Sequence, residues 1–166
     1  MPPVPNQHVQ SRLAEIERLL GSDPGSADAK ASELLQAVPD EPMAQLYQGI
    51  ARRMLGNPVA AIEVLRRLTE HWPDAPMAHL QLGLALREAG DNSAAADSMR
   101  RAVEVRQDFP DAWLALGDLL ATMSDTAGAD DAFGNYVGHS DSVPLLVQAG
   151  RALQDERVQE AESLLR

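Results

Sequence analysis

The chain has 166 residues, of which 45% are hydrophobic, and this is enough to bury the core of one ordinary domain or one array of repeats. Its 14 basic and 25 acidic residues give a formal net charge of −11, which disfavours nucleic acid and anionic membranes as partners. There is no cysteine, so disulfides and thiolate zinc sites are excluded.

The first residues, MPPVPNQHVQ, lack the basic start and apolar run of a signal peptide. The chain also has no run of about 18 apolar residues, the length that a membrane-spanning helix needs. We therefore predict a cytoplasmic protein without a membrane partner.

Residues 8–41 predict two helices joined by a loose turn. Apolar residues recur at helical spacing in VQSRLAEIERLLG and again in AKASELLQAVPD, with GSDPGSAD between the two segments. The glycine that the following units carry in their first helix is missing here. We interpret this segment as a degenerate first unit of a repeat.

Residues 42–143 repeat with a period of 34. PMAQLYQG begins at Pro42, and PMAHLQLG begins at Pro76. A fixed period of 20 to 50 residues is typical of stacked structural repeats. The positions that keep this period are Pro42, Pro76, Pro110 and Pro144; Gly49, Gly83 and Gly117; Leu46, Leu80 and Leu114; and Ala61, Ala95 and Ala129.

Each unit predicts a hairpin of two antiparallel helices. Proline suits the first turn of a helix, so we expect a helix to begin at each periodic proline. The segments LGNP, AGDN and MSDT then offer residues that close one helix and cap the next. The predicted hairpins are 42–75, 76–109 and 110–143.

Small residues within each hairpin predict a close crossing of its two helices. We expect each periodic glycine to face the periodic alanine of the same unit, as Gly83 would face Ala95. Leu65, Met99 and Phe133 are expected to fill the space between neighbouring hairpins.

The segment 144–166 predicts a fifth, partial unit. Its second helix ends within an apolar stripe at Leu164 and Leu165, whereas repeat arrays normally end in a polar capping element. We therefore expect 1–166 to be a single array that continues beyond Arg166 in a longer protein.

These features resemble the tetratricopeptide repeat family. The resemblance rests on the period of 34, on Trp113, Leu116 and Gly117, and on the periodic alanines. It implies an all-α fold, a right-handed α-solenoid of stacked hairpins. Three positions depart from the family pattern: Gln48 and Arg52 replace apolar residues, and Gln107 replaces a proline.

A narrower resemblance concerns the end of the chain. Residues 110–133 and 149–166 are similar to the N-terminal repeat region of bacterial proteins that join such repeats to a sulfotransferase domain. This resemblance implies a PAPS-dependent transferase domain downstream, with the present chain as its accessory module.

No motif predicts catalysis within these residues. Phosphate-binding glycine loops, HExxH and GxSxG are absent, and helix packing or helix ends account for the histidines. We predict no catalytic residue, no metal site and no cofactor.

The resemblance implies instead a groove lined by the first helix of each hairpin, which binds a peptide or a helix. Its apolar positions predict a partner with apolar anchors, and Arg53 and Arg87 could hold one acidic group. The partner could be another protein, a downstream domain of the same protein or a second copy of the chain. The predicted groove residues are Met43, Leu46, Ile50, Arg53, Met54, Met77, Leu80, Leu84, Arg87, Leu114 and Asp118.

Overall fold

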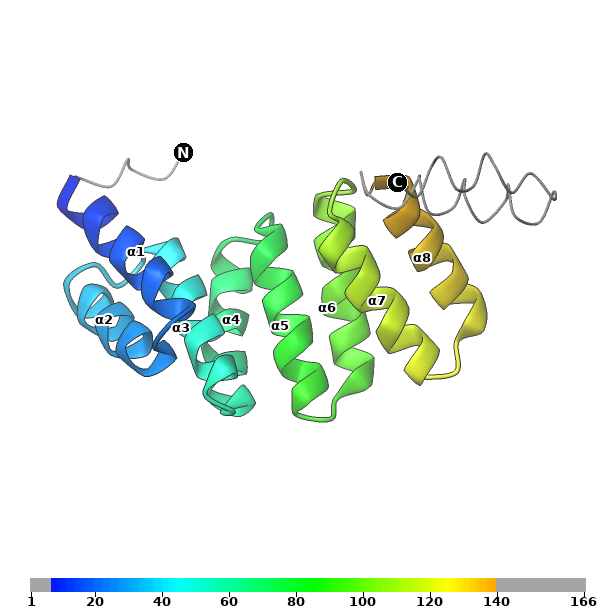
Figure 1. Ribbon diagram of the computed structural model, residues 1–166, viewed down its shortest axis with the longest axis horizontal. Helices are drawn as coiled ribbons and strands as arrows, with labels where there is room; N and C mark the ends of the chain where they lie inside the picture. The colour runs from blue at the N-terminus through cyan, green and yellow to red at the C-terminus, as the bar shows by residue number, and fades with distance from the viewer. Residues whose placement is uncertain (1–6, 140–166) are drawn as a thin grey trace, which may run out of the picture. The chain divides into compact units, whose positions relative to one another are not determined.

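A computed structural model describes residues 7–139, and this part of the chain is entirely α-helical (Figure 1). The helices there are α1 (Gln7–Leu20), α2 (Pro24–Ala37), α3 (Pro42–Met54), α4 (Pro58–His71), α5 (Pro76–Glu88), α6 (Asn92–Val105), α7 (Pro110–Thr122) and α8 (Thr126–His139). Consecutive helices pair as hairpins, whose first members we call A helices and whose second members we call B helices. The predicted all-α repeat fold is confirmed, whereas the predicted unit 144–166 lies outside the described residues.

The A helices of three hairpins begin at the periodic prolines, as predicted. Pro42, Pro76 and Pro110 are the first residues of α3, α5 and α7. A helix cannot use the N–H of its first residue, so proline loses nothing there, and its fixed φ already suits the helix.

The turn between A and B helices has the same construction in three hairpins. Gly56, Gly90 and Ser124 lie in the left-handed region, with φ of 72°, 87° and 64°. The next residue donates its N–H back into the A helix, as Asn57 does to the Arg52 carbonyl at 3.0 Å. This closure is a Schellman motif, and it satisfies carbonyl groups that the helix end leaves free.

The side chain that follows each left-handed residue caps the B helix. Asn57 and Asp91 accept hydrogen bonds from the amides of Ala60 and Ala94, at 3.2 and 3.1 Å. Asp125 accepts one from Gly128 in the same way, at 3.0 Å.

The first hairpin departs from the loose turn that the sequence predicts. Helix α1 ends at Leu20 and α2 already begins at Pro24, so the connection is as short as the others. Asp23 caps α2, because its carboxylate accepts hydrogen bonds from the Ser26 amide at 3.1 Å and from the Ser26 hydroxyl at 2.7 Å. A proline at the first helical position and this cap extend the helix into the segment expected to be a turn.

The close crossings lie where they were predicted, and the side chain nearest to each glycine is the one four residues after the expected alanine. A Cβ added to Gly49 would lie 2.5 Å from Leu65 Cγ, and one added to Gly117 would lie 2.6 Å from the Phe133 ring. At Gly83, a Cβ would meet Met99 Cγ at 2.7 Å and the Ala95 carbonyl oxygen at 3.0 Å. Leu65, Met99 and Phe133 thus pack against the glycine of their own hairpins, and the expectation that they also fill the space between hairpins stays a prediction.

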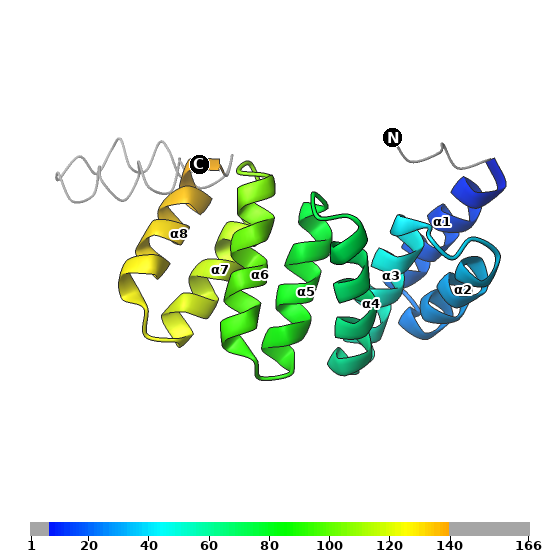
Figure 2. The ribbon, with the colours of Figure 1, turned by 180° about the vertical axis from the view of Figure 1, so that it is seen from behind.

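The described chain divides into two compact units, the first ending at Arg106 and the second beginning at Gln107. In the first unit, the A helices α1, α3 and α5 contact one another in sequence, whereas the B helices contact only A helices. Figure 2 shows the side on which α2, α4 and α6 follow one another. Helices α2 and α4 therefore both contact α3 but do not contact each other.

The second unit contains the hairpin of α7 and α8. Ala112, Leu116 and Leu120 are buried on α7, and Ala129 and Ala132 are buried on α8. Since Gly117 gives room for the Phe133 ring, this hairpin has the same internal packing as those of the first unit.

Candidate functional site

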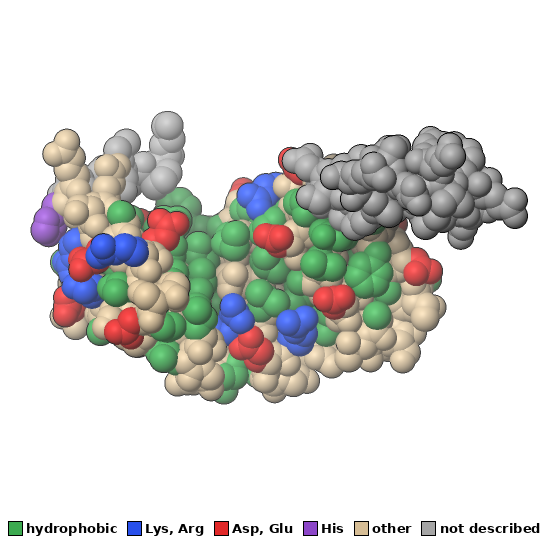
Figure 3. All heavy atoms as spheres, in the orientation of Figure 1, with side chains coloured by type: hydrophobic (Ala, Val, Ile, Leu, Met, Phe, Trp, Pro, Cys, Tyr) green, Lys and Arg blue, Asp and Glu red, His purple; other side chains and the backbone are tan. Residues whose placement is uncertain are grey.

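The predicted groove residues of the first unit lie on two neighbouring A helices, α3 and α5. These two helices contact each other directly. Figure 3 shows hydrophobic side chains over α3 and α5, beside a group of basic and acidic side chains. We call the apolar residues that keep solvent contact here the α3–α5 surface: Met43, Ile50, Met54, Met77 and Leu84.

Exposure differs along this surface. Met43 and Met54 are 39% and 49% exposed, near the two ends of α3, while Ile50, Met77 and Leu84 are half-buried. Exposed apolar side chains of this size on a helix that packs on both flanks are typical of a contact surface. Methionine also adapts its shape easily, because it is unbranched and has three rotatable bonds.

Two predicted groove residues are not exposed. Leu46 and Leu80 are only 8% and 4% exposed, so their side chains are buried within the protein. Both leucines lie on A helices that contact each other and their neighbouring B helices. They can support the surface from beneath, but a partner would make little contact with them.

Arg53, one of the two arginines that could hold an acidic group, already has partners within the chain. Its Nη1 lies 2.6 Å from Glu88 Oε1, and its Nε donates to Gln81 Oε1 at 3.3 Å. Glu88 is 34% exposed and Arg53 22% exposed, so the pair is only partly screened by solvent. Arg87 is exposed and has no ion-pair partner among the described residues.

Glu88 and Gln81 were not predicted as partners of Arg53. Glu88 follows Arg53 by 35 residues, one more than the period, so it lies at nearly the same height on the next A helix. Two opposite charges about one period apart on successive A helices are a sequence signal that could have indicated the Arg53–Glu88 ion pair.

Leu114 and Asp118, the remaining predicted groove residues, lie on α7 in the second unit. Leu114 is 37% exposed, and Asp118 is exposed as well. They therefore offer the second unit one apolar and one acidic contact.

The electrostatic surroundings of α3 include one perturbed phenol. Burial raises the pKa of Tyr47, and the nearby carboxylate of Glu17 raises it further. Tyr47 is 9% exposed and packs in the core of the first unit, so this pKa shift belongs to the structure rather than to a reactive site.

The described residues contain no group of three or more histidine, aspartate or glutamate side chains placed to hold a metal ion. None of the helices in that same part is long and apolar enough to span a bilayer.

Helical hairpins that repeat with a period of 34 residues define this chain as a helical-repeat protein. A comparison with known families identifies the type of repeat. The model of the tetratricopeptide repeat matches residues 13–76 and 80–135. The chain therefore belongs to the tetratricopeptide repeat family, whose members generally bind other proteins and are generally non-catalytic.

Solved structures support the fold. A crystal structure of MamA shares 23% identity and a TM-score of 0.69, covering 90% of this chain and 91% of that one. A thermophilic repeat protein of Thermus thermophilus shares 18% identity and a TM-score of 0.72, covering 94% and 87%. A mutant O-GlcNAc transferase of Thermobaculum terrenum shares 25% identity and a TM-score of 0.65, covering 68% of this chain and 22% of that one.

No curated protein matches the chain. The narrower resemblance to sulfotransferase-linked repeat regions stays a prediction.

Proposed function

We propose that this chain is a non-catalytic binding module that takes a helix or an extended peptide with apolar anchors along the α3–α5 surface. The observation that carries the proposal is the exposure of Met43 and Met54, at 39% and 49%, on an A helix. Two large apolar side chains are exposed to water at the ends of one helix. A partner that covers them removes this apolar surface from water, which favours binding.

The charged residues beside this surface favour a partner that is mainly apolar. The Arg53 charge is compensated by Glu88 at 2.6 Å, so a partner carboxylate would have to compete with Glu88. Arg87 is the better candidate for a charge-assisted contact, because it is exposed and unpaired among the described residues. A charge-assisted contact with the partner is therefore expected near Arg87, at one end of the α3–α5 surface.

The test uses peptides enriched from a random displayed library on the wild-type protein. In the double variant Met43→Gln and Met54→Gln, the enriched peptides should bind about tenfold or more weakly, because two buried anchors are lost from the interface. Fluorescence anisotropy of the labelled peptides measures the dissociation constants.

The chain offers a matched control in two other exposed apolar residues. Leu55, which follows α3, and Val59, in the first turn of α4, are 52% and 64% exposed, and neither is one of the residues of the α3–α5 surface. Leu55→Gln with Val59→Gln should leave the dissociation constants unchanged within about twofold. If both double variants bind alike, the α3–α5 surface is the wrong one.

A second copy of the chain is the alternative occupant. Sedimentation velocity over a range of concentrations distinguishes a second copy from a peptide partner. Self-association of the wild type that is lost in the Met43→Gln and Met54→Gln variant would assign the surface to a contact between copies.

A further inference from the structure

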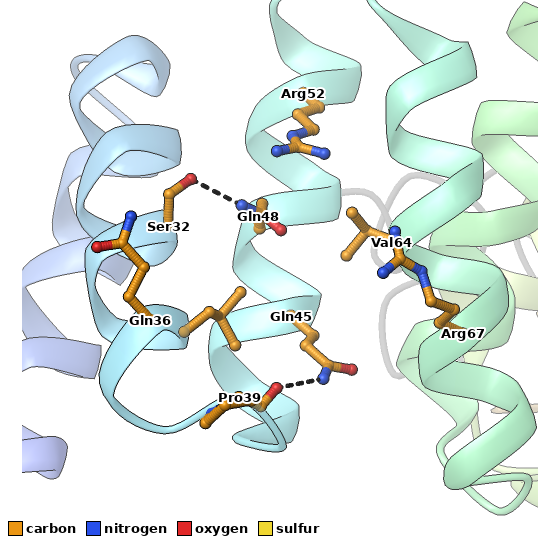
Figure 4. Close-up of a pocket in the computed structure, with 9 residues that line it drawn as sticks. Ser32, Gln36, Pro39, Gln45, Gln48, Arg52, Val64 and Arg67 are labelled. Carbon is orange, nitrogen blue, oxygen red and sulfur yellow. Dashed lines mark hydrogen bonds between the residues drawn. The ribbon is translucent and has the colours of Figure 1, made fainter.

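A cavity with both polar and apolar lining residues opens in the first unit, among the A helix α3 and the B helices α2 and α4. It has a volume of about 330 Å³. Its polar lining comes from all three helices and the loop after α2, as Figure 4 shows. The polar side chains are Ser32, Gln36, Gln45, Gln48, Arg52 and Arg67.

Two residues that line this cavity differ in type from the residues at the same positions of the later repeats. One and two periods after Gln48 come Leu82 and Leu116, which are 6% and 3% exposed. One and two periods after Arg52 come Leu86 and Leu120, which are 4% and 3% exposed. Helix α3 thus has an amide and a guanidinium where the later A helices α5 and α7 bury leucines.

Hydrogen bonds hold the walls of the cavity in place. Gln48 donates from Nε2 to Ser32 Oγ at 2.8 Å, and Gln45 donates from Nε2 to the Pro39 carbonyl oxygen at 2.9 Å. Arg52 donates from Nε to Asp28 Oδ1 at 3.0 Å. A binding site of fixed shape costs less ordering entropy when a ligand enters.

These bonds leave an excess of donors facing the cavity. The terminal nitrogens of Arg52 have no hydrogen-bond partner in the described part of the chain. Arg67 uses only Nε, which donates to the Glu63 carbonyl oxygen at 3.3 Å, so its terminal nitrogens are also available.

Acidic groups do not compete for these donors within the cavity. None of its lining residues is acidic. The two α2 carboxylates are in ion pairs, Asp28 with Arg52 at 3.0 Å and Glu33 with Arg12 at 3.5 Å. Asp28 thus compensates the charge of Arg52 through Nε, from outside the lining, whereas Arg67 is in no ion pair among the described residues.

We propose that this cavity binds a compact carboxylate, held by the terminal nitrogens of Arg52 and Arg67. A planar carboxylate with two acceptor oxygens fits the planar fork of a guanidinium, and a charge-assisted bond is stronger than a neutral one. The volume suits a small molecule or the end of a peptide. This proposal is independent of the α3–α5 surface.

The test is an NMR titration of the ¹⁵N-labelled chain with acetyl-glycyl-glycine, which has a free carboxylate, and with its carboxamide. The side-chain signals of Gln45, Gln48 and Arg52 should shift and saturate with the acid but not with the amide. Equal effects of acid and amide, or no saturation with either, would overturn the proposal.

Adjacent arginines on α4 give a matched pair of variants. Arg67→Gln removes a lining cation and should weaken binding of the acid about tenfold or more. Arg66→Gln makes the same charge change at an exposed residue that does not line the cavity, and should change it by less than about twofold. Equal weakening in both would indicate a long-range charge effect and contradict the site.

A filling variant tests the cavity itself. Gln48→Leu and Arg52→Leu restore the residues of the later repeats, and Asp28→Ala removes the carboxylate that would lose its partner. This triple variant should keep its helical content and lose binding. Binding that survives in a folded triple variant would refute the proposal.

Two further probes identify the source of the carboxylate. Succinate that saturates the site at lower concentration than acetyl-glycyl-glycine points to a free small acid, and the reverse order points to a peptide terminus. Inorganic phosphate that binds more tightly than both would overturn the assignment to a carboxylate.

Discussion

At the scale of single residues, the turns show how backbone conformation selects the amino acid. Gly56 and Gly90 have positive φ, and a Cβ added to either would meet nothing within 4 Å. Space therefore does not require glycine at these positions, and the left-handed conformation alone does.

We predict that Gly56→Ala and Gly90→Ala each lower the free energy of unfolding by about 1 kcal/mol, through backbone strain. Ser124, with φ of 64°, occupies the same position in the last described turn, so Ser124→Gly should raise stability by up to about 1 kcal/mol. Urea unfolding followed by circular dichroism measures both. A loss of stability in Ser124→Gly would show that the Ser124 side chain makes a contribution beyond this strain.

The cap of α2 predicts a dependence on pH. Hydrogen bonds from the Ser26 hydroxyl and amide lower the pKa of Asp23 below its ordinary value of 3.8. A carboxylate whose pKa is lowered by folding stabilises the protein above its unfolded pKa, and this contribution is lost as the pH falls through the folded pKa.

Asp23→Asn keeps an acceptor for the cap but cannot titrate. The wild type should therefore unfold at a higher temperature than this variant at neutral pH, and its advantage should disappear as the pH falls below 3.8. Ser26→Ala removes the largest cause of the pKa shift and should reduce the advantage. An advantage that is unchanged at low pH would contradict the assignment.

At the scale of elements, the helix crossings show what the sequence could and could not predict. The periodic prolines predicted the starts of α3, α5 and α7 because proline acts through its own backbone. The nearest side chain to each crossing glycine lies four residues, about one helical turn, after the expected alanine, although an added Cβ at Gly83 would also meet the Ala95 carbonyl oxygen. Helical side chains lean towards the N-terminus, so Leu65 rather than Ala61 covers the place opposite Gly49.

Contacts between successive repeats were also difficult to predict, because they depend on the spatial approach of two helices and not on the sequence period alone. Burial of Leu46 and Leu80 and the pairing of Arg53 with Glu88 depend on how closely successive A helices approach. Periodicity gives the order of the helices along the chain, but side-chain volume and rotamer decide that approach.

Crossing glycines and surface glycines should respond to alanine in opposite ways. Gly83→Ala should cost about 1–3 kcal/mol, because the new Cβ would lie 2.7 Å from buried Met99 and 3.0 Å from a backbone oxygen. Gly134 lies within α8 with nothing within 4 Å of an added Cβ, so Gly134→Ala should gain about 0.5–1 kcal/mol of helix propensity. Thermal unfolding of both variants tests this; equal shifts would contradict the described crossing.

At the scale of the whole molecule, the first unit presents two different surfaces. One surface carries the exposed methionines of α3, and the other holds the cavity that α2, α3 and α4 line. The sequence contained signals of both, in the periodic apolar residues and in the departures at Gln48 and Arg52. Only the structure shows that these two departures line one cavity.

The most direct measurement of the central claim is a titration of the chain, labelled at its methionine methyl groups, with a peptide enriched on the wild-type protein. The methyl signals of Met43, Met54 and Met77 should shift together and saturate, because these residues belong to the α3–α5 surface. Met99, which is fully buried, and Met123, which is exposed at the end of α7, serve as controls and should shift little. Shifts confined to Met123, or the absence of shifts at Met43 and Met54 under saturating peptide, would contradict binding at the α3–α5 surface.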